Sequence, residues 1–191
     1  MEYIKFLSHF RFIFVMDFVA HLLWSGIIFQ NYQGWLSVFF GGVPDLIPFG
    51  ANLIASPFRR KKGSSAQFSK NMKNSDSQAR KASLIEYYNL EENKWVYRVY
   101  NYTHSLVVWG LMFALFCVIG HFQGFFPYFM FAWLLHILID IPTHEKVFFA
   151  PQFLTPLSEF NIDGYSWANK YFQFINYALI IIGILVSLYL F

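Results

Sequence analysis

Long apolar segments dominate this chain of 191 residues and constrain its fold more than any other feature. Residues 11–29, 104–122 and 172–191 each approach the roughly 20 apolar residues that a helix needs to cross a bilayer core about 30 Å thick. The chain is 57% hydrophobic and only 13% charged, which excludes an ordinary soluble domain. The sequence therefore predicts a single all-α membrane domain over residues 1–191, a polytopic helix bundle.

Two further segments are expected to cross the membrane. Residues 125–141 end at Pro142, and their short distance from the preceding segment predicts a tight helical hairpin with Gly124 in its turn. Residues 34–54 are apolar but contain four residues that disrupt helices, Gly41, Gly42, Pro44 and Pro48. We expect a broken helix that lines a cavity, because irregular backbone at membrane depth needs partners for its polar groups.

Basic residues predict the orientation of the chain. Ten of its fourteen Lys and Arg residues lie within residues 59–98, so this segment is predicted to be a cytoplasmic loop. Its stretch 62–83, rich in Ser, Lys, Asn and Gln, is predicted to be disordered. Lys5 and Arg11 place the N-terminus on the same side. About five crossings follow, one of them broken, with no signal peptide and with the C-terminus outside.

The same basic loop indicates which partners to expect. Basic loops beside membrane spans contact anionic lipid head groups, so membrane lipids are the expected partners and nucleic acid is not. Docking of a soluble protein on the loop stays open as an alternative. Residues 145–171 combine turn-forming Pro and Gly with Phe and Trp side chains, which predicts a segment at the membrane interface.

His136 and Asp140 lie four residues apart, which places both on one face of an otherwise apolar helix. An ionisable group at mid-bilayer costs about 2.5–3.5 kcal/mol on insertion scales, so it usually faces a partner or a functional cavity. Counting about 1.5 Å per residue along the predicted spans places four more polar residues in the same cytoplasmic half. These residues are Asp17, His21, Asp45 and His104.

Imidazoles and carboxylates in one cluster suit a divalent metal such as zinc, manganese or iron. The predicted metal ligands are His21, Asp45, His104, His136 and Asp140. Asp17 and Asp45 are the predicted catalytic residues, with Asp17 either orienting His21 or acting as general base. Five ligand candidates exceed the three usual at a catalytic zinc, so either two metals bind or some residues orient the ligands. His144 and Asp163 are secondary candidates.

Four short motifs follow one another along the chain: His21, Pro44-Asp45, Thr103-His-Ser105, and His136 to Asp140. In this order they resemble the bacterial YdjM-like family of LexA-binding, inner-membrane-associated metal-dependent hydrolases. The resemblance implies a multi-pass protein of the bacterial inner membrane with a metal-dependent hydrolase site. Tyr100-Asn101-Tyr102 stands where the family usually has His-Arg-Gly, so one basic or ligand position differs.

The expected function is hydrolysis assisted by a metal ion, which lowers the pKa of a bound water and polarises the bond to be cut. A site just below the cytoplasmic surface suits a lipid-linked phosphate or ester. The alternative is a divalent-cation or proton-coupled transporter that uses the same His and Asp residues. The lack of a visible inverted repeat in the sequence counts against a transporter.

Overall fold

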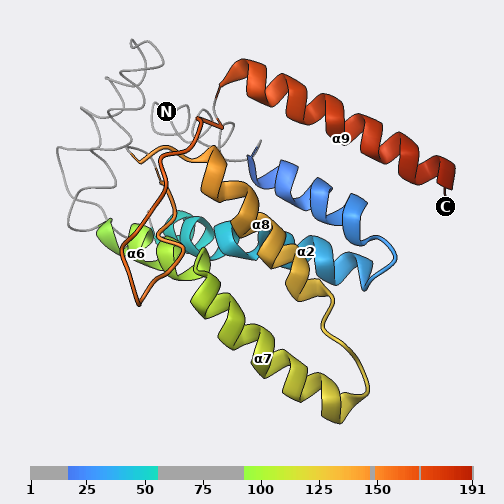
Figure 1. Cartoon of the computed structure of the whole chain (residues 1–191), viewed down its shortest axis with the longest axis horizontal. Coiled ribbons are helices and arrows are strands. Elements are labelled where there is room, and N and C mark those ends of the chain that lie inside the picture. The colour runs from blue at the N-terminus through green and yellow to red at the C-terminus, as the bar shows by residue number, and fades with distance from the viewer. Residues whose placement is uncertain (1–16, 56–92, 147–148, 168, 191) are drawn as a thin grey trace.

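The computed structural model describes residues 17–55, 93–146, 149–167 and 169–190. The regular elements of these residues are helices, as the composition predicts (Figure 1). They are the Asp17–Phe29 helix, α2 (Gly34–Asp45), the π-helical turn η1 (Leu46–Gly50), α3 (Ala51–Ala55), α6 (Lys94–Thr103), α7 (Leu106–Gln123), α8 (Phe129–Thr143) and α9 (Lys170–Leu190).

Within the described residues, three helical segments are long and apolar enough to cross a membrane: Gly34–Ala55, Leu106–Gln123 and Lys170–Leu190. α8 has 15 residues, which extend about 22 Å and fall short of a bilayer core about 30 Å thick. The Asp17–Phe29 helix is apolar but shorter still, and residues 11–16 of that predicted span lie outside the described part of the chain. The five predicted crossings therefore stay a prediction, of which three have the necessary length.

α7 and α9 present apolar side chains almost all round. Only 6% of the residues in the most apolar window of each helix are buried within the protein. Leu111 on α7 and Leu188 on α9 are among the large exposed side chains. Because exposed apolar helix surface is unfavourable in water, these two helices suit contact with lipid.

The predicted break in residues 34–54 is a π-helical turn rather than an unwound stretch. α2 continues through Gly41, Gly42 and Pro44, and the irregular turn η1 follows Asp45. π-helical turns are rare and often lie at functional sites. Pro48 in η1 lacks an N–H group, so it cannot bond the carbonyl of Pro44 four residues earlier.

Glycines allow the Asp17–Phe29 helix to approach α2 closely. A Cβ atom on Gly41 would lie 1.9 Å from Ser25 Oγ, and one on Gly42 would lie 2.7 Å from atoms of Leu22 and Phe18. On its other side, α2 packs extensively against α8. α2 is thus held between two helices, and residues 41–45 are buried.

The end of the predicted basic loop is helical. Residues 94–98 form the first half of α6, whereas residues 59–92 of that loop lie outside the described residues. Ser105 starts α7, because its Oγ accepts hydrogen bonds from the backbone N–H groups of Val107 at 3.1 Å and Val108 at 3.2 Å. His104 therefore lies at the junction of α6 and α7, just before the span that the sequence assigns to it.

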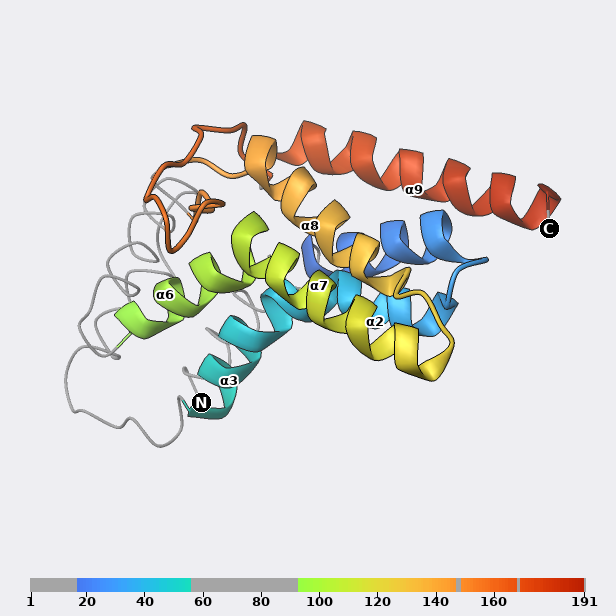
Figure 2. The same cartoon turned by 60° about the horizontal axis from the view of Figure 1, so that its bottom comes forward.

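The two short turns of the bundle, residues 30–33 and 124–128, lie at the same end of the molecule in both views (Figures 1 and 2). The C-terminal ends of α2 and α8 and the junction of α6 and α7 lie away from these turns. The chain beyond α8 folds back on it: the N–H groups of Gly164, Tyr165 and Trp167 donate to carbonyls of residues 142–144 at 2.7–2.9 Å. These bonds satisfy the free carbonyls at the C-terminal end of α8 and hold residues 164–167 against it.

Candidate metal centre

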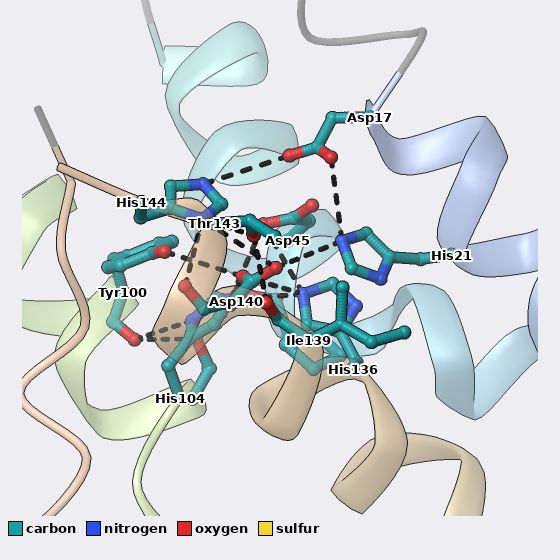
Figure 3. A network of polar contacts seen from close by, with 12 residues as sticks. Asp17, His21, Asp45, Tyr100, His104, His136, Ile139, Asp140, Thr143 and His144 are labelled. Carbon is teal, nitrogen blue, oxygen red and sulfur yellow. Dashed lines mark hydrogen bonds and ion pairs between the residues drawn. The ribbon is translucent and has the colours of Figure 1, made fainter. Parts of the chain in front are cut away.

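The structure brings the six site residues predicted from sequence into one cluster and adds a seventh, His144 (Figure 3). The Asp17–Phe29 helix contributes two of them, α2 and the α6–α7 junction one each, and α8 with its C-terminal end three. The Asp17 side chain is 18% exposed, whereas the other six side chains are at most 6% exposed. The cluster is therefore buried and reaches the surface at Asp17.

Three of these residues converge most tightly. His104 Nε2 lies 3.1 Å from His136 Nε2, and Asp140 Oδ2 lies 3.0 Å from the first nitrogen and 3.3 Å from the second. Asp45 Oδ1 is 3.6 Å from His104 Nε2 and 3.8 Å from His136 Nε2. One ligand atom from each of the four residues lies within 4.8 Å of all the others.

Backbone carbonyls fix the tautomers of the two histidines. His136 Nδ1 lies 2.6 Å from the carbonyl oxygen of Gly41, and His104 Nδ1 lies 2.9 Å from that of Tyr100. A carbonyl only accepts hydrogen bonds, so each Nδ1 carries the proton and donates it. In the neutral imidazoles, both Nε2 atoms are then lone-pair donors that face the Asp140 carboxylate.

This arrangement fits a metal cation. Two nitrogen lone pairs and a carboxylate oxygen about 3 Å apart repel one another unless a positive charge lies among them. Metal-bound histidines typically donate their other ring N–H to a carbonyl or carboxylate, as both do in this cluster. Asp45, His104, His136 and Asp140 could therefore hold a metal ion, with a donor set of two imidazoles and two carboxylates.

A second group of residues adjoins the first. Asp17 Oδ1 lies 3.6 Å from His21 Nε2, and Asp17 Oδ2 lies 3.7 Å from His144 Nε2. Asp140 Oδ1 faces the same group, at 3.0 Å from His21 Nε2. Two sets of possible ligands come from this side: Asp17 with His21 and Asp45, and Asp17 with Asp140 and His144.

Two residues of α6 support the cluster. Thr103 Oγ1 donates to the carbonyl of Pro44 at 2.8 Å, the oxygen to which Pro48, four residues later, has no N–H to donate. The Tyr100 hydroxyl is 3.5 Å from Asp140 Oδ2, and its ring stacks on His104 with 3.8 Å between centroids. Burial, and then the nearby Asp140 carboxylate, raises the pKa of the Tyr100 hydroxyl well above its usual value, so it remains a donor.

His144 lies one turn beyond Asp140, at the C-terminal end of α8. Its Nδ1 is 3.3 Å from the carbonyl oxygen of Asp140, which leaves Nε2 directed toward Asp17. Burial lowers the pKa of His144 below its usual value, so the neutral, ligating form predominates at pH 7. The sequence signal for His144 was the same four-residue spacing that relates Asp140 to His136.

The other secondary candidate, Asp163, has a different role. Its Oδ1 accepts a hydrogen bond from the backbone N–H of Lys146 at 2.8 Å, in an exposed position. It belongs to none of the three groups of possible metal ligands among the described residues. Asp163 therefore stabilises the segment after α8 and serves as a carboxylate outside the cluster.

Comparisons with known proteins give no match for this chain. No protein-family model matches it, and no curated protein and no solved structure is similar to it. The resemblance to the YdjM-like family thus depends on the four ordered motifs alone. The described part of the chain is all-helical, with three candidate membrane spans and a buried His/Asp cluster that could hold a metal ion.

Proposed function

We propose that this protein is a membrane-embedded, metal-dependent hydrolase that acts at the cytoplasmic face of a bacterial inner membrane. The observation that carries the proposal is the convergence of His104 Nε2, His136 Nε2 and Asp140 Oδ2, with both Nδ1 atoms bonded to carbonyls. The motif resemblance to the YdjM-like hydrolases supports the same reading.

The cluster residues have distinct proposed roles. His104 and His136 supply nitrogen ligands, and Asp45 and Asp140 supply oxygen ligands, to a zinc or manganese ion. Such an ion, when bound, acidifies a water and polarises a phosphoryl or carbonyl group. Asp17 is the proposed general base, because it is the cluster residue nearest to solvent and its carboxylate lies 3.6 Å from His21.

The proposed substrate is a lipid-linked phosphate or ester. A buried polar site beside two helical segments of membrane-spanning length, Gly34–Ala55 and Leu106–Gln123, suits a molecule with an apolar tail and a polar head. The basic run at residues 59–62, outside the described part of the chain, would attract an anionic head group. A substrate head would enter at Asp17, where the cluster is partly exposed.

A five-crossing topology with the N-terminus in the cytoplasm is part of this proposal. It places the cluster in the cytoplasmic half of the membrane, beside the basic loop. Reporter fusions at residues 70 and 191 test it. A cytoplasmic reporter signal at 70 and a periplasmic one at 191 support the proposal, and the same side for both contradicts it.

The activity is tested with purified protein in lipid nanodiscs loaded with Zn²⁺ or Mn²⁺. Release of phosphate from lipid phosphates and diphosphates, and of fatty acid from phospholipids, is measured for the wild type, His136→Gln and His121→Gln. We expect turnover by the wild type and His121→Gln but not by His136→Gln. No turnover by metal-loaded wild type, together with metal uptake into proteoliposomes, would instead favour the transporter.

A further inference from the structure

Two polar atoms on the side of Asp140 that faces away from His104 have no hydrogen-bond partner among the described residues. They are His21 Nε2 and Asp140 Oδ1, and both are buried. The two atoms lie only 3.0 Å apart, yet they do not form a hydrogen bond with each other. Buried polar atoms without a hydrogen-bond partner are costly and rare, so this pair indicates a missing ligand.

The two oxygens of the Asp140 carboxylate face different histidines. Oδ2 is 3.0 Å from His104 Nε2 and 3.3 Å from His136 Nε2, the tight set of the candidate metal centre. Oδ1 is 3.0 Å from His21 Nε2 and 3.8 Å from His144 Nδ1 (Figure 3). One carboxylate therefore serves two separate sets of imidazoles, which is how a bridging carboxylate lies between two metal ions.

The second set has donors like those of the first. Asp17 lies between its two histidines, with one oxygen 3.6 Å from His21 Nε2 and the other 3.7 Å from His144 Nε2. His144 Nδ1 lies near the carbonyl of Asp140, so Nε2 carries the lone pair, as in the first set. Asp17, Asp140 and His144 each offer an atom within 4.8 Å of the other two.

The charges of the cluster also favour a second ion. Among the described residues, only histidines lie within ion-pair distance of Asp17, Asp45 and Asp140. When all three carboxylates act as ligands, one divalent ion balances two of them and a second ion balances the third.

We infer that Asp140 bridges two divalent metal ions, the second held by Asp17, His21 and His144, so that Asp17 serves as a ligand in place of the general base. The inference depends on the metal site of the proposed function and makes its substrate class more specific. Paired ions about 3.5–4 Å apart are typical of enzymes that displace groups at phosphorus. The second set contains Asp17, the most exposed residue of the cluster, so a phosphate head group would meet this set first.

Metal stoichiometry and electron paramagnetic resonance test the inference. Chelated wild-type protein is dialysed to saturation against Zn²⁺ or Mn²⁺, the bound metal is counted, and the Mn²⁺ form is examined spectroscopically. We expect two ions per chain and the signal of a magnetically coupled Mn²⁺ pair. One magnetically isolated ion per chain at saturation would overturn the inference, and this result needs no variant.

Variants identify the residues. His21→Gln and His144→Gln should each bind one Mn²⁺ that gives an isolated six-line spectrum, whereas His121→Gln, at the far end of α7, should retain the coupled pair. A coupled pair in both His21→Gln and His144→Gln would overturn the assignment of the second set. Circular dichroism and gel filtration identify any variant that fails to fold.

The two proposals fail in different ways. One ion per chain with hydrolysis of a lipid phosphate would overturn the bridged pair and leave the hydrolase in place. Two coupled ions without hydrolysis of any lipid phosphate or ester would support the bridged pair and overturn the hydrolase.

Discussion

α7 and α8 are consecutive apolar helices joined by a short turn, yet they differ in where they lie and in what they carry. α7 is almost entirely exposed. It contains no Asp, Glu, Lys or Arg, and its one histidine, His121, lies in its last turn. α8 is buried against α2 along much of its length and carries His136 and Asp140 in its interior. Ionisable groups thus occur where neighbouring helices shield them from lipid.

The contrast teaches that hydropathy alone does not separate the two helices. Both would be read as spans, but only α8 has neighbours close enough to supply partners for a buried imidazole and carboxylate. The small residues of α2 provide this proximity, because Gly41 and Gly42 admit the helix that carries Asp17 and His21. The metal centre is therefore a property of helix packing as much as of the His/Asp pair.

The histidines of the two helices offer the strongest test of this contrast. His136→Gln removes a proposed ligand and should lower metal affinity by more than about 100-fold, since changes to groups that only orient ligands already cost 10–100-fold. His121→Gln in α7 should leave the affinity unchanged. Isothermal titration with Zn²⁺ measures both. Equal affinities for the two variants would show that α8 has no special role.

Glycines of α2 and α7 provide the next test. Gly41→Ala places a methyl group against Ser25 and should destabilise the protein by about 1–3 kcal/mol. Gly110→Ala in α7, where a Cβ meets nothing within 4 Å, should be neutral or stabilise by up to about 1 kcal/mol. Reversible unfolding in mixed micelles measures both. A neutral Gly41→Ala would mean that the two helices are not packed as described.

Much of this arrangement follows from the sequence, and the reasons are specific. The spacing of His136 and Asp140 on an apolar segment predicts a shared face, and counting depth along predicted spans groups these residues with Asp17, His21, Asp45 and His104. All six lie in the cluster. Ionisable residues in apolar helices are few, so their positions carry most of the information about where helices meet.

Other features depended on tertiary packing. Pro142 predicts that its helix ends at Ile141, one residue before the proline. In the structure α8 continues to Thr143 and carries His144 at its end. The helix α6 was not predicted, because much of it lies in the basic segment 59–98. Its buried residues Val96, Tyr100 and Thr103 nevertheless follow helical spacing. The glycines of α2 predict a break when read singly, but in the folded protein they make room for another helix.

The smallest expected effect concerns the support of Asp140 from α6. Tyr100→Phe removes a long hydrogen bond of 3.5 Å to Asp140 Oδ2 and keeps the ring that stacks on His104. Metal affinity should fall by about tenfold or less, at the lower end of the range for groups that orient ligands. Tyr102→Phe, in the same helix and 44% exposed, is the control and should change nothing. A loss as large as that of His136→Gln would make Tyr100 a ligand itself.

The most direct test of the account is the metal content of protein purified without chelators from cells grown with added zinc and manganese. Elemental analysis compares the wild type, Asp140→Asn and Asp163→Asn, whose carboxylate lies outside the cluster. We predict stoichiometric metal in the wild type and Asp163→Asn, and almost none in folded Asp140→Asn. A wild-type protein without bound metal, or equal metal in all three proteins, would contradict the claim that this cluster is a metal centre.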